Sequence, residues 1–109
     1  MGLNDVATSH VDVVTWEHDD ETGGLVHMLH SDDAVEVGLW RPGATANTTI
    51  EVILQARETL LVLSGSARLQ VNDDPPRDLR PGTIVTLPRG VRTRWVVDEA
   101  FSEVWIYSS

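Results

Sequence analysis

The stretch from Glu58 to Trp95 decides the fold, and it reads ETLLVLSGSARLQVNDDPPRDLRPGTIVTLPRGVRTRW. Short apolar segments alternate here with turn-forming glycines and prolines, which end strands and close turns. Glu58 lies seven residues before Gly65, and Gly82 lies six residues before Pro88. The spacing predicts a series of short antiparallel strands joined by tight turns.

The rest of the chain continues this pattern. We expect strands over residues 25–30, 34–40, 50–54, 59–63, 67–71, 83–87, 91–97 and 101–107. No window carries a helical period. Strands that recur at short intervals with turns between them are typical of a sandwich or barrel. We therefore predict an all-β, single-domain jelly roll over residues 25–109. Residues 1–24 would form an N-terminal arm, in which residues 11–14 are either a short edge strand or partly frayed.

The histidines give little support for a metal site. His18 lies in an acidic segment, residues 16–24, that we expect to be a solvated loop, and adjacent loop residues rarely converge on one ion. His27 and His30 are three residues apart, so on a regular strand they face opposite sides. Ordinary strand positions are favoured for both, although one of them can still point inward.

Composition limits the possible partners. The 109 residues carry 17 acidic and 8 basic side chains, a net charge of −9, and every basic residue is Arg. This balance disfavours binding to nucleic acid or to an anionic membrane. There is no cysteine, no apolar run long enough to span a membrane, and no basic-then-apolar leader at the N-terminus. We expect a soluble, cytoplasmic protein.

The turn spacing resembles that of the cupin superfamily. The family's first motif has two histidines, a glutamate and then a glycine, and its second has a glycine, Pro-x-Gly and a histidine. Glu58 with Gly65, and Gly82 with Pro88 and Gly90, match these motifs. The resemblance implies a double-stranded β-helix of the RmlC-like type. Residues 38–43 and the closing strands look like a small single-domain branch related to ureidoglycine aminohydrolase-like and ethanolamine-utilisation cupins.

The sequence departs from the family at its metal ligands. The positions of the two motif histidines hold Val52 and Leu54, or Glu51 and Ile53 in the other register, and the third histidine position holds Thr93. Residues 44–63 contain no His in any register. A transition metal needs three or four nitrogen, oxygen or sulfur ligands. We therefore predict no metal at the family site, and no cofactor.

Glu58 is the most informative single residue. If it keeps the inward direction of the family glutamate, it lies in a largely apolar barrel. It must then be hydrogen-bonded, paired with Arg68 or Arg94, or protonated. Paired, it has a structural or ligand-orienting role. Unpaired, it is a candidate general acid or base, with Tyr107, His27 or His30 as its partner.

Aromatic residues complete the predicted pocket. Each tryptophan can fill the core, but together they can form a wall that stacks on a ring. The candidate catalytic residues are Glu58 and Tyr107, and the candidate ligand-binding residues are Trp40, Val52, Leu54, Glu58, Arg68, Thr93, Trp95 and Trp105.

Three hypotheses follow for the function. The first is a metal-free cupin that binds a small apolar or cyclic molecule around Glu58. The second is a cofactor-independent isomerase, cyclase or lyase that uses Glu58 as acid or base. The third is a metalloenzyme with atypical ligands, such as Glu58 with His27 or His30. Small cupins usually pair through sheet edges, so the resemblance also implies a homodimer.

Overall fold

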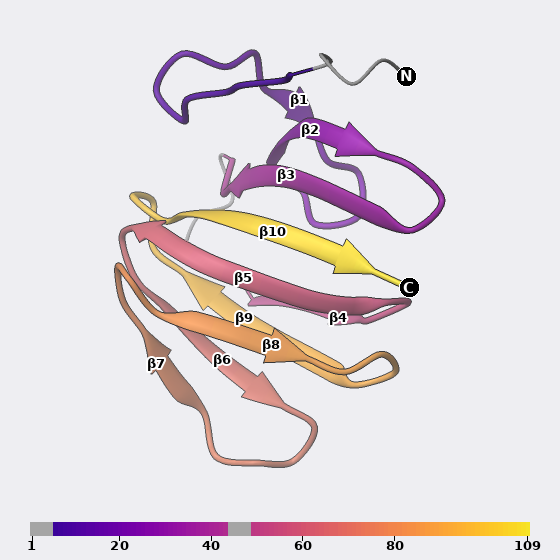
Figure 1. Cartoon of the computed structure of the whole chain (residues 1–109). Helices are drawn as coiled ribbons and strands as arrows, with labels where there is room; N and C mark the ends of the chain where they lie inside the picture. The colour runs from indigo at the N-terminus through magenta and orange to yellow at the C-terminus, as the bar shows by residue number, and fades with distance from the viewer. Residues whose placement is uncertain (1–5, 44–48) are drawn as a thin grey trace.

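A computed structural model describes residues 6–43 and 49–109, and its regular structure consists of strands (Figure 1). The strands are β1 (Glu17–His18), β2 (Leu25–Ser31), β3 (Val35–Arg41), β4 (Thr49–Ile53), β5 (Arg57–Ser64), β6 (Ala67–Val71), β7 (Arg77–Leu79), β8 (Ile84–Leu87), β9 (Arg92–Val97) and β10 (Ser102–Ser108). This confirms the all-β prediction. Within the described ranges no helix could cross a membrane.

The strands form two antiparallel sheets. One has six strands in the order β1-β2-β3-β10-β5-β8, and the other has four in the order β4-β9-β6-β7. The last strand, β10, is inserted between β3 and β5, as Figure 1 shows. Neighbours in space are thus distant in sequence, as in a double-stranded β-helix, and the predicted jelly roll is confirmed.

Alternation along the strands builds the core between the sheets. On β5, Leu60 and Val62 are buried while Leu63 is exposed, and on β9 Trp95 and Val97 are buried while Val96 is exposed. A period of two puts the buried positions of each strand on one face of its sheet. The two inner faces pack together and set the direction of every side chain discussed below.

Several local predictions were wrong. Residues 11–14 form a turn rather than an edge strand, because the amides of Val13 and Val14 donate to the carbonyl of His10. The edge strand is β1, inside the segment predicted as a loop, and it pairs with β2. Strand β7 pairs with β6 where we expected only a connection. Between the strands predicted over residues 34–40 and 50–54 we expected a small, polar loop over residues 44–49; it lies outside the described residues except for Thr49, which opens β4.

The motif glycine Gly65 is required by the turn that it makes. Its φ is +68°, in the left-handed region that favours glycine. A Cβ there would collide with the backbone nitrogen of Phe101 and lie 2.6 Å from an oxygen of Asp98. The turn between β5 and β6 therefore packs directly against the segment that enters β10.

Candidate functional site

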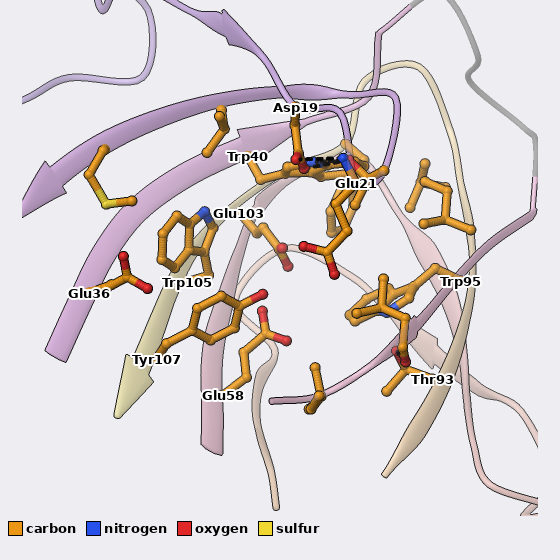
Figure 2. Close-up of a pocket in the computed structure, with 18 residues that line it drawn as sticks. Asp19, Glu21, Glu36, Trp40, Glu58, Thr93, Trp95, Glu103, Trp105 and Tyr107 are labelled. Atoms are coloured by element: carbon orange, nitrogen blue, oxygen red, sulfur yellow. Dashed lines mark hydrogen bonds between the residues drawn. The ribbon is translucent and has the colours of Figure 1, made fainter. Parts of the chain in front are cut away.

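The inner faces of the two sheets enclose a cavity of about 260 Å³ (Figure 2). One wall comes from β2, β3, β5 and β10, the opposite wall comes from β4 and β9, and the loop between β1 and β2 contributes a third side. The volume is close to the lower end of the roughly 300–1,000 Å³ typical of ligand pockets. It suits a small molecule with a single ring.

The strand register gathers the polar residues of the first wall. Glu58, Tyr107 and Glu36 form one row across β5, β10 and β3. Trp105 and Glu103 follow at the next two inward positions of β10, because alternate residues share a face. Figure 2 shows the Tyr107 hydroxyl and the carboxyl groups of Glu58 and Glu103 directed toward the same space.

The aromatic part of this wall depends on Gly38. Gly38 is the register partner of Trp105, and a Cβ there would lie 2.5 Å from Cζ2 of the indole and collide with the carbonyl oxygen of His27. With that space free, Trp105 packs on Tyr107, with ring centroids 4.9 Å apart and an interplanar angle of 35°. A glycine in β3 thus allows two rings to line the cavity side by side.

The opposite wall holds Thr93 and Trp95 on β9, with Val52 on β4 and Leu54 just after it. The hydroxyl of Thr93 donates a 2.8 Å hydrogen bond to the carbonyl of Val52. Its proton is therefore used inside the sheet, and the hydroxyl oxygen can act only as a hydrogen-bond acceptor toward the cavity. Phe101 lies within 6.4 Å of the Trp95 ring, centroid to centroid, and continues the aromatic surface.

The loop between β1 and β2 is tied to the cavity by hydrogen bonds. The indole Nε1 of Trp40 donates to Oγ1 of Thr22 over 2.9 Å, and that hydroxyl donates to Asp19 over 2.6 Å. Position 24 requires glycine, because the Cβ of any other residue would lie 2.6 Å from the Trp40 ring. This anchoring brings the carboxyl groups of Asp19 and Glu21 to the cavity (Figure 2).

Two carboxyl groups are deeply buried in this site. Glu58 is 5% exposed and Glu103 is 7% exposed. Burial, followed by the charge of Glu21, raises the pKa of Glu58 to about 7. Burial, followed by the charge of Glu58, raises the pKa of Glu103 well above its ordinary value. The same apolar surroundings and acidic neighbours also raise the pKa of the Tyr107 hydroxyl.

The arginines that we considered as partners for Glu58 lie elsewhere. Arg68 is on the outer face of β6 and forms a 3.2 Å ion pair with Asp78, so, contrary to the prediction, it does not line the cavity with the other candidate residues. Arg94 pairs with Glu51 on the outer face of β9. Both positions follow the solvated half of an alternating strand. Glu58 thus has no arginine partner among the described residues.

The two strand histidines also lie outside the cavity. The His27 ring is within hydrogen-bond distance of the Ser9 hydroxyl and the Thr15 carbonyl. The His30 ring lies 2.7 Å from the carboxylate of Asp32, and this contact, together with the backbone amides of Ala34 and Val35, lowers the pKa of that carboxyl group to about 2. Neither ring lines the cavity with Glu58. The atypical metal site that combined Glu58 with His27 or His30 is therefore not formed.

The other predicted residues are brought together at the cavity: Trp40, Val52, Leu54, Glu58, Thr93, Trp95, Trp105 and Tyr107 all line it. Sequence reasoning missed Glu103, although it shares the face of Trp105 and Tyr107 at positions i, i+2 and i+4. It also missed Glu21, because the loop is held by Trp40, which is distant in sequence.

The sequence also matches a model of a known protein family. A family model described as an EutQ-like cupin domain matches residues 30–104. The chain belongs to this family. The resemblance read from Glu58, Gly65, Gly82 and Pro88 is thereby confirmed. The match runs from the end of β2 into β10, so the β1–β2 loop that lines the cavity lies outside it.

Solved structures share the fold at low sequence identity. A putative ethanolamine utilization protein Q (EutQ) from Salmonella typhimurium superposes with a TM-score of 0.83 at 13% identity, covering 98% of this chain and 89% of that one. The polyketide cyclase RemF from Streptomyces resistomycificus gives 0.78 at 17% identity, covering 95% and 80%. An RmlC-like cupin from Methanocaldococcus jannaschii gives 0.67 at 15%, covering 92% and 93%. No curated protein matches the sequence significantly.

The residues at the family's metal positions do not fit an imidazole-ligated metal. Val52 and Leu54 offer only hydrocarbon, and the hydroxyl proton of Thr93 is already donated to the backbone. No group of three or more His, Cys, Asp or Glu side chains in the described part of the chain has the geometry to hold a metal ion. What the cavity offers instead is carboxyl groups between aromatic rings.

Proposed function

We propose that this cupin binds a small cyclic molecule in its barrel without a metal ion, with aromatic rings as walls and Glu58 as a polar anchor. The observation that carries the proposal is the cavity itself: the rings of Trp40, Trp95, Trp105 and Tyr107 line it around the Glu58 carboxyl group. Flat rings make large contacts with a bound ring, and a few polar groups orient it.

Burial of the carboxyl groups supports binding rather than a purely structural role. A buried polar group without a partner destabilises the folded state. Glu103 Oε2 is buried and has no hydrogen-bond partner among the described residues, and Glu58 has no arginine beside it. Stability alone favours apolar residues at both positions. Such groups are typical of functional sites, where a ligand supplies the missing partner.

The four tryptophans allow a direct test of binding. Labelling with 5-fluorotryptophan gives one ¹⁹F signal for each ring, and single Trp→Phe variants assign the signals. Trp16 is an internal control, because it lies outside the cavity with the Arg41 guanidinium 4.5 Å from its ring centroid. Titration with indole should shift the signals of Trp40, Trp95 and Trp105 and leave that of Trp16 unchanged. Equal shifts at all four rings, or none, contradict the proposal.

Acid–base catalysis by Glu58 is a second candidate, supported by its pKa of about 7. At that pKa a carboxyl group can both accept and release a proton near neutral pH. Tyr107 is its register partner on β10 and can hold a substrate oxygen or relay a proton. RemF, which shares the fold, is described as a polyketide cyclase, so related barrels include enzymes.

The two candidates differ in what a Glu58→Gln variant does. If Glu58 is the acid or base of an isomerase, cyclase or lyase, the variant binds the substrate but loses turnover. Tyr107→Phe is the companion variant, because it removes the neighbouring hydroxyl and keeps the ring. Full turnover by Glu58→Gln excludes the catalytic role of Glu58 and leaves the binding function in place.

A further inference from the structure

The wall of the cavity has a one-sided charge. Five carboxyl groups line it, and the described residues contribute no Arg or His side chain to it. Glu58 and Glu103 are buried in the barrel, Asp19 and Glu21 reach it from the β1–β2 loop, and Glu36 comes from β3. Wherever these carboxyl groups are ionised, they would repel an anionic ligand.

A second, independent observation is that the carboxyl group of Glu103 lacks a hydrogen-bond partner for one of its oxygens. Glu103 lines the cavity, and its Oε2 atom is buried and accepts no hydrogen bond from the described residues. A carboxylate oxygen accepts hydrogen bonds, so the complementary group is a donor. A charged donor suits it best, because charge-assisted hydrogen bonds are the stronger kind.

The rings favour the same class of ligand. Trp95, Trp105 and Tyr107 line the cavity together with the carboxyl groups, and Trp105 packs on Tyr107 at 4.9 Å. The face of an indole or phenol ring attracts a cation, and indole does so most strongly. A small hydrated metal ion gains little from such apolar walls, whereas an organic cation contacts both the rings and the carboxylates.

We propose that the ligand is an organic cation: a protonated amine on a body of about one ring, with its ammonium group between Glu58 and Glu103 and its apolar part against the aromatic walls. This inference rests on the proposed binding function and names the chemical class of its ligand.

Binding of a cation should change the protonation of the cavity carboxyl groups. Glu58 is faced by Glu103 and Tyr107 from β10 and by Glu21 and Asp19 from the β1–β2 loop, so its neighbours are acidic or neutral. Burial raises the pKa of Glu58 to about 7, so this carboxyl group is partly protonated at neutral pH, and burial also raises the pKa of Glu103. An entering ammonium group favours their ionised forms, and the released carboxyl proton goes to the buffer. Binding of a cation should therefore release protons and strengthen as the pH rises from 6 to 8.

Three probes with the same ring test the charge: phenethylammonium, phenethyl alcohol and 3-phenylpropionate. Calorimetric titration of the full chain at pH 7.5, in two buffers of different ionisation enthalpy, measures affinity and proton release together. Phenethylammonium should bind about tenfold more tightly than the alcohol and release protons. The alcohol should release none, and 3-phenylpropionate should bind most weakly.

Single Glu→Gln variants test which carboxyl groups bind the ammonium group of the probe. Glu103→Gln and Glu21→Gln should reduce the affinity for phenethylammonium severalfold and leave that for the alcohol unchanged. Glu99→Gln is the control, because Glu99 is exposed in the turn before β10 and does not line the cavity. Glu21 lies on a loop, so its variant tests the inference even if Glu103→Gln folds poorly.

The outcomes separate the two proposals. Equal binding of ammonium and alcohol, with shifts at the cavity tryptophans, overturns the charge inference and leaves the binding function. Binding of Zn²⁺ at one equivalent with no binding of phenethylammonium also overturns it. If none of the three probes moves a cavity tryptophan signal, the binding function fails and the charge inference fails with it.

Discussion

Acidic side chains occur in two different settings on the two sheets. On the outer face of the four-stranded sheet, Asp78 pairs with Arg68 and Glu51 pairs with Arg94, and these side chains are mostly exposed. On the inner face of the six-stranded sheet, Glu58 and Glu103 are buried without an arginine. Exposed pairs contribute little to stability, whereas buried carboxyl groups without partners destabilise the fold. This contrast is the reason why we place the proposed binding site on the inner face.

The largest expected effect is a loss of stability with rising pH. The folded-state pKa of Glu58, about 7, lies above its ordinary value of 4.5, so the folded protein holds a proton that the unfolded chain releases between these values. The free energy of unfolding should therefore fall by about 3 kcal/mol from pH 4.5 to pH 7. Urea unfolding at intervals of half a pH unit measures this. The control is Glu58→Gln, in which the slope should fall by this amount and keep only the contribution of Glu103; an unchanged slope assigns it to other groups.

Removal of the second buried carboxyl group should stabilise the protein. Folding at pH 8 must either protonate Glu103 or bury its charge, and Glu103→Gln avoids both. We expect the free energy of unfolding to rise by about 2 kcal/mol at pH 8 and to change little at pH 4. Chemical unfolding at the two pH values measures the difference. A destabilised variant at pH 8 means that the carboxyl group already has a partner.

The Thr93→Val variant removes a polar group that has a hydrogen-bond partner. It can be compared with Glu103→Gln, which changes a group in the same cavity that has an oxygen without a partner. Thr93 donates to the Val52 carbonyl, so the nearly isosteric valine loses a hydrogen bond and leaves that carbonyl without this donor. The variant should lose about 1 kcal/mol of stability, opposite in sign to the change in Glu103→Gln. Thermal unfolding measures it. A gain in stability would place Thr93 in the same class as Glu103.

The smallest effect is expected on the outer face. Arg68→Ala removes an exposed pair with Asp78 and should change the free energy of unfolding by no more than about 0.5 kcal/mol. It should also leave probe binding unchanged, since Arg68 does not line the cavity. A loss of probe affinity in this variant would restore the original prediction that Arg68 contacts the ligand.

The fold was predictable because its signals are local. Gly65, Gly82 and Gly90 lie at turns where φ is positive, a conformation that favours glycine, and apolar alternation marks the strands between them. The inward direction of Glu58 came from the family resemblance. The same alternation predicted that Arg68, between Ala67 and Leu69, faces solvent, so its assignment to the pocket contradicted a pattern already visible in the sequence.

Two parts of the site depend on contacts that no local pattern encodes. The β1–β2 loop reaches the cavity through a hydrogen bond between Thr22 and Trp40, which are 18 residues apart. Glu103 shares an inward face with Trp105 and Tyr107, but its closeness to Glu58 follows from the insertion of β10 beside β5. The position of β10 in the sheet is set by the topology of the whole chain. Local sequence patterns therefore do not show which carboxyl groups lie close together.

The central claim is that burial without a partner raises the pKa of two barrel carboxyl groups, Glu58 and Glu103, above the ordinary range of glutamate. A pH titration of the glutamate side-chain carboxyl carbons by ¹³C NMR, assigned with Glu58→Gln and Glu103→Gln, tests it directly. The account predicts that Glu58 titrates near pH 7 and Glu103 well above the ordinary range of glutamate. Titration of both groups near 4.5 would contradict it.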